Sequence, residues 1–133
     1  AHPLAVDNLA NPTSFFGMLP VDVPPVETDE TLADGAAVPL GGHVFTVMHL
    51  PGHDPSHIAL VDENREIFLG GDVLFPGGHG RTDLPGGNYD RLIASINENL
   101  MSLGDEYTVM CGHGPDTTVG KERAGNPFLT GLY

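Results

Sequence analysis

One pattern recurs three times along this chain of 133 residues. A short apolar run ends, one or two glycines follow, and a residue with a metal-ligand side chain comes next. The three copies are Leu50-Pro51-Gly52-His53, Phe68-Leu69-Gly70-Gly71-Asp72 and Met110-Cys111-Gly112-His113. Glycine lets the backbone turn sharply off a strand and lets a bound group approach closely. If the three runs are strands of one sheet, His53, Asp72 and His113 converge at one edge of it.

The donor chemistry of these three residues favours a metal site. Two imidazoles and one carboxylate are borderline nitrogen and oxygen donors, which suit Zn²⁺ or Fe²⁺. A metal ion held there would acidify a bound water into a nucleophile. The alternative is that each is an ordinary loop residue with local hydrogen bonds. The threefold recurrence favours a shared site over three separate coincidences.

The hydrophobic pattern predicts an α/β protein, in which a sheet is layered with helices. The segment 88–103 carries apolar residues at helical spacing, with Asn88 as a cap and Gly104 after its end, and we expect it to cross over between two strands. Pro-rich residues 11–25 predict a loop, and Asn126-Pro127 is expected to end the last helix. Helices are expected over residues 3–10, 88–103 and 118–124, and strands over residues 36–40, 44–48, 57–61, 66–69 and 107–111.

The composition of the chain excludes some classes of binding partner. The chain carries 18 acidic and 5 basic residues, a net charge of −13, so we expect no nucleic acid and no anionic membrane as partners. No apolar run approaches the ~20 residues that a membrane-spanning helix needs. The single cysteine, Cys111, allows no internal disulfide. A cytoplasmic protein with one domain over residues 1–133 is the resulting expectation.

Other polar residues near the pattern are assigned supporting roles. His49 and His57 are expected at strand ends or behind the ligands, because Pro51, Gly52 and Pro55 forbid a helix that would align them with His53. His79 is expected to be a solvated loop histidine, and Cys111 a small apolar strand-end residue. In the glycine-rich loop, Arg81 and Asp83 are expected to form an ion pair. Arg81 facing an anionic substrate is the alternative.

The motifs occur in an order that resembles the short, glyoxalase II-like branch of the metallo-β-lactamase-fold hydrolases. The resemblance runs from about Leu32 to Leu129, and the opening Ala1-His2-Pro3-Leu4 extends it. The motifs that carry it are Pro51-Gly52-His53, Gly71-Asp72, Gly80-Arg81-Thr82-Asp83-Leu84-Pro85-Gly86-Gly87, Gly112-His113-Gly114-Pro115 and Asn126-Pro127-Phe128-Leu129.

This resemblance implies the carboxy-terminal half of an αββα sandwich with its metal site at one edge. By resemblance, His53 binds a first metal, His113 binds a second, and Asp72 bridges the two. Two Zn²⁺ are implied for the complete enzyme, with Fe²⁺ as the alternative. A metal-held hydroxide would attack the carbonyl of a thioester or other ester, and thioesters of glutathione-like thiols are the implied small-molecule substrates.

The chain also departs from that family. The His-x-His-x-Asp-His motif, which supplies the other ligands upstream, is absent, so we expect a fragment whose catalysis alone is in doubt. Two further hypotheses stay open. The Gly80–Asp83 loop also resembles the persulfide dioxygenases of this superfamily, which are oxidoreductases with one iron. The third hypothesis is a non-catalytic fragment that forms a homo-oligomer through the sheet face its missing half would cover.

Overall fold

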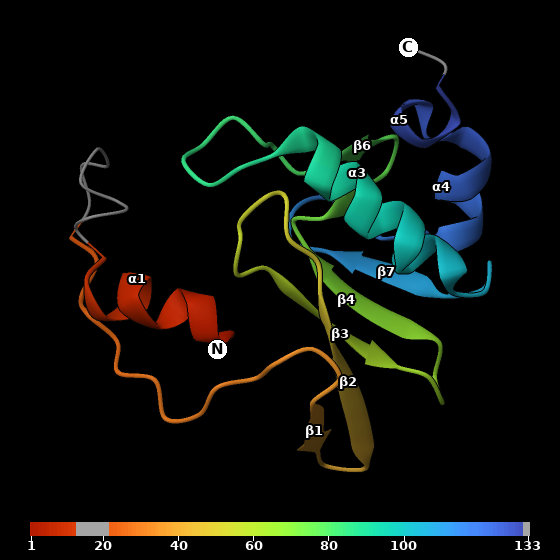
Figure 1. Ribbon diagram of the computed structural model, residues 1–133. Coiled ribbons are helices and arrows are strands. Elements are labelled where there is room, and N and C mark those ends of the chain that lie inside the picture. Colours follow the sequence, from red (N-terminus) through yellow and green to blue (C-terminus); the bar gives the residue numbers. More distant parts are fainter. Residues whose placement is uncertain (13–21, 132–133) are drawn as a thin grey trace.

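The protein is described by a computed structural model that covers residues 1–12 and 22–131 (Figure 1). Its centre is a mixed six-stranded sheet in the order β1-β2-β3-β4-β7-β8. Neighbouring strands are antiparallel except β4 and β7, which are parallel. A separate two-stranded hairpin is formed by β5 (Leu74–Phe75) and β6 (Gly78–His79). The sheet strands are β1 (Ala37–Leu40), β2 (His43–His49), β3 (Ile58–Asp62), β4 (Ile67–Gly71), β7 (Thr108–Cys111) and β8 (Thr117–Thr118).

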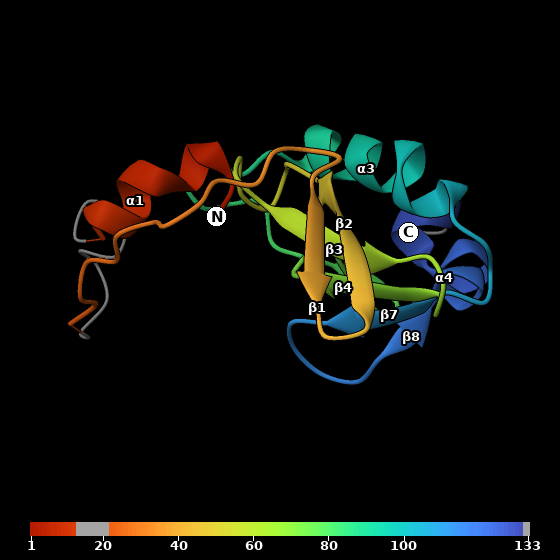
Figure 2. The ribbon, with the colours of Figure 1, turned by 90° about the horizontal axis from the view of Figure 1, so that it is seen from below.

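The helices confirm the predicted α/β class and the predicted crossover. Between the parallel strands β4 and β7 the chain passes through α3, which lies along one side of the sheet (Figure 2). Within the described ranges, no helix is long and apolar enough to cross a membrane. The helical elements are η1 (Pro3–Ala5), α1 (Val6–Ala10), α3 (Tyr89–Glu98), η2 (Leu100–Ser102), α4 (Val119–Gly125) and α5 (Pro127–Thr130).

The hydrophobic core lies between one face of the sheet and α3. Alternate strand residues point to this face because successive side chains of a strand point to opposite sides. Phe68 and Val109 are opposite one another on β4 and β7, and both are fully buried against Leu92 and Ile96 of α3. Burying side chains of this size stabilises the fold by about 1.5–3 kcal/mol each. This core fixes β4 and β7 beneath α3.

The helix predicted over residues 88–103 ends earlier than expected. Asn88 caps its start as predicted, its Oδ1 accepting the N–H of Arg91 at 2.9 Å. Asn99 is the C-cap, with φ −114°, and the chain continues as the short 3₁₀ helix η2. The guanidinium of Arg123 donates to the carbonyls of Met101 within η2 and of Leu103 directly after it. A tightened last turn with such a donor satisfies the carbonyls that a helix end leaves free.

Three short elements were not predicted, because two-residue strands and a four-residue helix carry no hydrophobic period. They are the β5–β6 hairpin, β8 and α5. The expectation that Asn126-Pro127 ends the helix over residues 118–124 is confirmed, since α4 ends at Gly125 with Asn126 as its C-cap. Oδ1 of Asn126 then accepts the N–H of Phe128, and the unpredicted α5 begins. Proline fits the first position of a helix, where its missing N–H costs nothing. Of the loop predicted over 11–25, residues 13–21 lie outside the described residues.

Candidate metal centre

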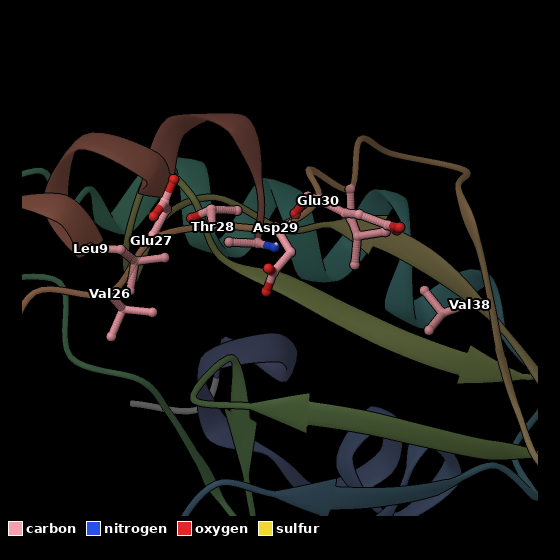
Figure 3. A pocket seen from close by; sticks show the side chains of 9 residues that line it. Leu9, Val26, Glu27, Thr28, Asp29, Glu30 and Val38 are labelled. Carbon is pink, nitrogen blue, oxygen red and sulfur yellow. Dashed lines mark hydrogen bonds between the residues drawn. The ribbon is translucent and has the colours of Figure 1, made fainter.

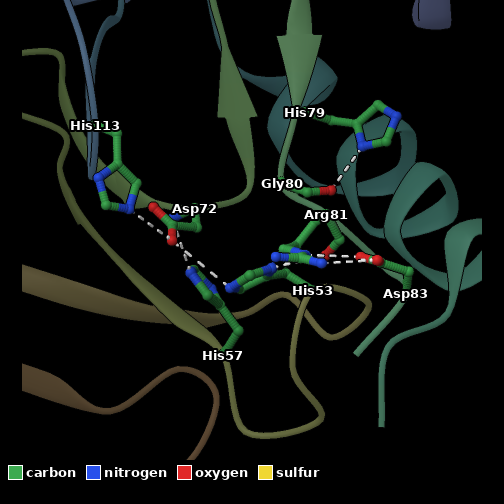
Figure 4. A network of polar contacts seen from close by, with 8 residues as sticks. All are labelled: His53, His57, Asp72, His79, Gly80, Arg81, Asp83 and His113. Carbon is green, nitrogen blue, oxygen red and sulfur yellow. Dashed lines mark hydrogen bonds and ion pairs between the residues drawn. The ribbon is translucent and has the colours of Figure 1, made fainter. Parts of the chain in front are cut away.

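The topology brings the three residues of the recurring pattern to one edge of the sheet. Strands β2, β4 and β7 run in the same direction, so their carboxyl ends meet there. Nε2 of His113 lies 3.2 Å from Oδ2 of Asp72, and Nε2 of His53 lies 3.6 Å from the same oxygen. Figure 4 shows both imidazoles pointing at the carboxylate. The predicted convergence is therefore present in the structure.

His53 is positioned by a close contact between its loop and α3. Gly52 has φ +141°, and a Cβ atom there would overlap the backbone of Leu92. The carbonyl of Gly52 accepts the N–H of Asn88 at 2.7 Å, and Ser95 donates its hydroxyl to the carbonyl of Pro51 at 2.7 Å. Only glycine combines this conformation with this approach. The helix start thus holds the loop that carries His53.

Asp72 is positioned by an irregularity at the end of β4. The β4–β7 register shifts between Leu69 and Gly71, where Gly71 takes φ +53°. The carbonyl of Gly71 accepts the N–H of Gly112 at 2.7 Å, which ties the two strand ends together. A Cβ at Gly112 would meet Oδ1 of Asp72. The carboxylate therefore lies against the backbone that leads to His113.

The hydrogen bonding of His53 fixes which of its nitrogens faces Asp72. Nδ1 lies 2.8 Å from the carbonyl oxygen of Arg81, and a carbonyl only accepts, so Nδ1 carries the hydrogen. In the neutral imidazole, Nε2 then presents a lone pair to a carboxylate oxygen. At 3.6 Å the two atoms are beyond hydrogen-bond range. Two acceptors that face each other in this way suit a cation between them.

The donor set fits part of a two-metal site. Ligands about 2.0–2.2 Å from a tetrahedral ion lie about 3.3–3.6 Å from one another, close to both observed separations. In residues 1–12 and 22–131, however, no group of three or more His, Cys, Asp or Glu side chains is placed to hold one ion. The structure thus offers two pairs that share Asp72, and each pair is short of a full ligand set. His113, with its side chain 78% exposed, is the more open member.

The glycine-rich loop contains the predicted ion pair. Arg81 donates from Nε and from its second terminal nitrogen to the two carboxylate oxygens of Asp83, both at 2.7 Å. The hydrogen bond from Arg81 holds the pKa of Asp83 down at about 2, and the same contact raises the pKa of Arg81. Both side chains are exposed, so the pair shapes the loop more than it stabilises the fold. The loop presents the Arg81 carbonyl that orients His53.

Two other histidines lie as expected and a third does not. Nε2 of His57 accepts the backbone N–H of Asp72 at 3.2 Å, directly behind the candidate ligands. His49 stacks on His2 with ring centroids 4.1 Å apart. His79 was expected to be a solvated loop residue, which is wrong. It is half-buried, 4.4 Å from the ring of Phe128, because β6 carries it beneath α5.

A buried polar network that the sequence did not indicate anchors the β5–β6 hairpin. The carboxylate of Glu122, only 4% exposed, accepts hydrogen bonds from Thr117, Asn126 and the N–H of Gly77. Asn126 also donates to the carbonyl of Gly78. Helix α4 therefore holds the hairpin that leads into the Arg81 loop. Only the Glu122–Asn126 contact has the four-residue spacing of a helix, and the contacts with Gly77 and Thr117 follow no such spacing, so the sequence does not indicate the network.

Two further features lie outside the site. The Cys111 thiol donates to the carbonyl of Leu74, and burial raises its pKa, as expected for a structural cysteine rather than a reactive one. A pocket of about 450 Å³ opens between α1 and residues 26–32, where Leu9, Val26 and Val38 meet acidic side chains (Figure 3). None of the predicted site residues lines it.

Comparison with known proteins identifies the family. The chain belongs to the metallo-beta-lactamase superfamily, which matches residues 3–113. It is 46% identical over 96 residues to the hydroxyacylglutathione hydrolase GloC of Haemophilus influenzae, covering 72% of this chain and 45% of that protein. It is 38% identical over 112 residues to the probable metallo-hydrolase YqgX of Bacillus subtilis, covering 84% and 53%. The chain thus spans about half the length of the curated relatives it matches.

Solved structures agree on the fold. The BLEG-1 B3 metallo-beta-lactamase superposes with a TM-score of 0.84 at 35% identity, over 97% of this chain and 63% of that one. A di-iron-bound form of TTHA1623 gives 0.83 at 40% identity, over 96% and 63%. ETHE1 from Myxococcus xanthus gives 0.71 at 32% identity, over 76% and 46%. The predicted metallo-β-lactamase fold, represented here by its carboxy-terminal part, is therefore confirmed.

Proposed function

We propose that this chain is the carboxy-terminal part of a metal-dependent hydrolase that cleaves a small thioester or ester, in the manner of glyoxalase II. The observation that carries the proposal is the convergence of His53 and His113 on one oxygen of Asp72, where the lone pair of His53 faces a second acceptor. The similarity to a hydroxyacylglutathione hydrolase supports the thioester as substrate class. Residues 1–133 form one part of a single domain in this proposal.

Each residue has a separate role in the proposed chemistry. His53 and Asp72 would hold one metal ion, and Asp72 and His113 the other, with Zn²⁺ as the expected metal and Fe²⁺ as the alternative. A bound metal ion supplies Lewis acidity, which activates water and polarises a carbonyl. The chain's own contribution is orientation: the Arg81 carbonyl fixes the His53 tautomer, and the Gly71–Gly112 contact fixes Asp72. Contacts that fix the orientation of ligand side chains in this way strengthen metal binding.

Thioester hydrolysis by the complete gene product tests the proposal. We expect turnover of a hydroxyacylglutathione or a simpler acyl-thiol, with loss of about 10²-fold or more when His53 or Asp72 is replaced by alanine. Unchanged turnover in both variants would exclude the proposed roles. His49→Gln is the matched control, because His49 lies at the same strand end but bonds to the carbonyl of Pro55 instead.

The role of the Arg81 loop can be separated in the same assay. If Arg81 only forms the ion pair, Arg81→Ala and Asp83→Ala raise KM equally and the double variant adds nothing. If Arg81 contacts an anionic part of the substrate, its replacement raises KM more than that of Asp83. We propose the first outcome, since the two carboxylate oxygens of Asp83 already occupy the guanidinium.

An oxidoreductase with one iron is the second candidate, favoured by the similarity to ETHE1 and by the Gly80–Asp83 loop. It predicts one iron per chain and oxygen uptake with a persulfide substrate. Zinc content without oxygen uptake would remove it. The two readings share the same candidate ligands, so metal analysis and the choice of substrate separate them.

A self-associating fragment is the third candidate, favoured by the sheet face opposite α3. Leu60, Ile67 and Leu69 are only half-buried there and Met110 is 39% exposed. An apolar face of this kind favours association. Sedimentation of the chain should then show oligomers that Met110→Lys weakens. Leu84→Lys, at a loop position of similar exposure, is the control.

A further inference from the structure

Behind the candidate ligands, His57 makes a contact that the proposed chemistry does not use. Its Nε2 accepts the backbone N–H of Asp72 at 3.2 Å, across 15 residues of sequence. Figure 4 shows the ring pointing at Asp72, and His57 is the residue directly before β3. An N–H group only donates, so Nε2 is the unprotonated nitrogen and Nδ1 carries the hydrogen.

The Nδ1 atom of His57 is buried, and among the described residues it has no hydrogen-bond partner. A buried donor without a partner costs free energy, so stability alone does not account for an imidazole here. A hydroxyl or carboxylate acceptor could satisfy the Asp72 N–H without an orphaned ring N–H.

The surroundings of Asp72 show what the His57 contact controls. The backbone carbonyl of Asp72 lies so close to Gly80 that a Cβ on Gly80 would overlap it, and Oδ1 of Asp72 lies against Gly112. On the amino side, Gly71 leaves room for the His57 ring, since a Cβ on Gly71 would approach Nε2 to 2.8 Å. The backbone N–H is the remaining anchor, and His57 supplies it. A shift of this N–H would rotate the carboxylate away from the two imidazoles.

We propose that His57 is a positioning residue, which holds the Asp72 backbone so that its carboxylate lies between His53 and His113. The inference rests on the proposed function for the identity of the ligands. It goes beyond that function by assigning the geometry of Asp72 to a residue that touches neither metal nor substrate. Partners that orient ligands in this way typically change metal affinity by about 10–100-fold when they are removed.

The test compares variants of the complete gene product, stripped of metal and titrated with Co²⁺. His57→Leu removes the acceptor, and we expect Co²⁺ to bind about 10–100-fold more weakly with altered visible bands. His57→Gln keeps an acceptor and should restore much of the affinity. The ring of His49 bonds to the carbonyl of Pro55, so His49→Gln should bind Co²⁺ with the same affinity and visible bands as the unaltered protein. Affinity and bands in His57→Leu that match the unaltered protein would overturn the proposal.

A second measurement needs no metal and guards against a folding defect. In the metal-free protein, the amide of Asp72 should exchange slowly with solvent and become faster in His57→Leu, while amides of β2 stay unchanged. If amides throughout His57→Leu lose protection, this variant is misfolded, and His57→Gln then decides the test. An Asp72 amide that exchanges rapidly in the unaltered protein would overturn the proposal, as would failure of the unaltered protein to bind Co²⁺. An unaltered protein that binds Co²⁺ but does not hydrolyse thioesters would instead count against the proposed function alone.

Discussion

Nε2 of His53 faces Oδ2 of Asp72 at 3.6 Å, and because Nδ1 donates to the Arg81 carbonyl, the facing nitrogen of the neutral imidazole carries no hydrogen. Two electron-rich atoms held at this distance repel each other mildly unless a proton or a metal ion lies between them. The contact of Gly52 with α3 positions His53, and the Gly71–Gly112 hydrogen bond positions Asp72. A metal ion between the two atoms would therefore stabilise the arrangement, and both metal addition and a change of charge at Asp72 should reveal it.

We expect metal to stabilise the folded protein through this pair. At a free concentration of 100 times Kd, a ligand that binds only the folded state adds about 2.7 kcal/mol to the free energy of unfolding. Asp72→Asn should remove most of this gain. Its amide can donate to Nε2 of His53, so the metal-free variant should be as stable as the unaltered protein or more so, by about 0.5–1.5 kcal/mol. Thermal unfolding with Zn²⁺ and with a chelator measures both effects, and an equal Zn²⁺ shift in the two proteins would contradict the assignment.

Gly52 should be among the least replaceable residues of the chain. Gly52→Ala forces a side chain into φ +141° and onto the backbone of Leu92. Strain and overpacking each cost about 1–3 kcal/mol, so we expect a loss of about 2–6 kcal/mol together with weaker metal binding. Gly125→Ala is the control, because a Cβ there meets nothing within 4 Å and alanine favours the helix. Denaturant unfolding of the two variants compares them, and similar values would contradict the close contact.

The sequence predicted the convergence of the three candidate ligands better than it predicted the element ends. Each candidate ligand follows a strand and a glycine, and a sheet brings such ends together wherever the strands run in one direction. His57 is different, because its partner is a backbone N–H 15 residues away, and no spacing rule encodes such a contact. Glu122 is different for the same reason, since its donors come from three separate elements.

Element ends depend on tertiary contacts that periodicity does not report. Leu92, Ile96 and Leu100 keep the predicted helical spacing, yet α3 ends at Glu98 and Leu100 belongs to the 3₁₀ turn η2. The apolar stripe continues through the turn because the same core covers both. The His79 environment shows the converse: a polar residue in a glycine-rich segment becomes half-buried once α5, unpredicted, packs over it.

Asp62 should make the stability of the fold depend on acidity. Its buried carboxylate accepts from Nδ1 of His43 at 2.7 Å and from the N–H groups of Asn64 and Arg65. The His43 hydrogen bond lowers the pKa of Asp62 below its usual 3.8. A carboxyl with a lowered pKa in the folded state contributes stability that is present above pH 3.8 and is lost as the pH falls through the folded-state pKa.

Asp62→Asn should therefore be less stable than the unaltered protein at pH 6, and the difference should shrink as the pH falls below 3.8 and through the folded-state pKa of Asp62. Urea unfolding across that range measures it. Asp83→Asn serves as the comparison, because Asp83 also has a low pKa but lies in an exposed ion pair, which contributes little to the stability of the fold. A pH-independent difference for Asp62→Asn would show that its contribution is not that of a charged carboxylate.

Asn126 should matter far more than an ordinary helix cap. It caps α5 through Oδ1, and its amide also supports the buried Glu122 carboxylate and the carbonyl of Gly78. Asn126→Ala loses the cap, worth about 1 kcal/mol, and leaves buried groups unpaired at about 1–3 kcal/mol more. Asn88→Ala loses only the cap of α3 and should cost about 1 kcal/mol. Calorimetric unfolding of both variants checks this. Equal losses of unfolding free energy in the two variants would mean that Glu122 does not depend on Asn126. The network also anchors the β5–β6 hairpin and, through it, the Arg81 loop, so Asn126→Ala should weaken Co²⁺ binding as well.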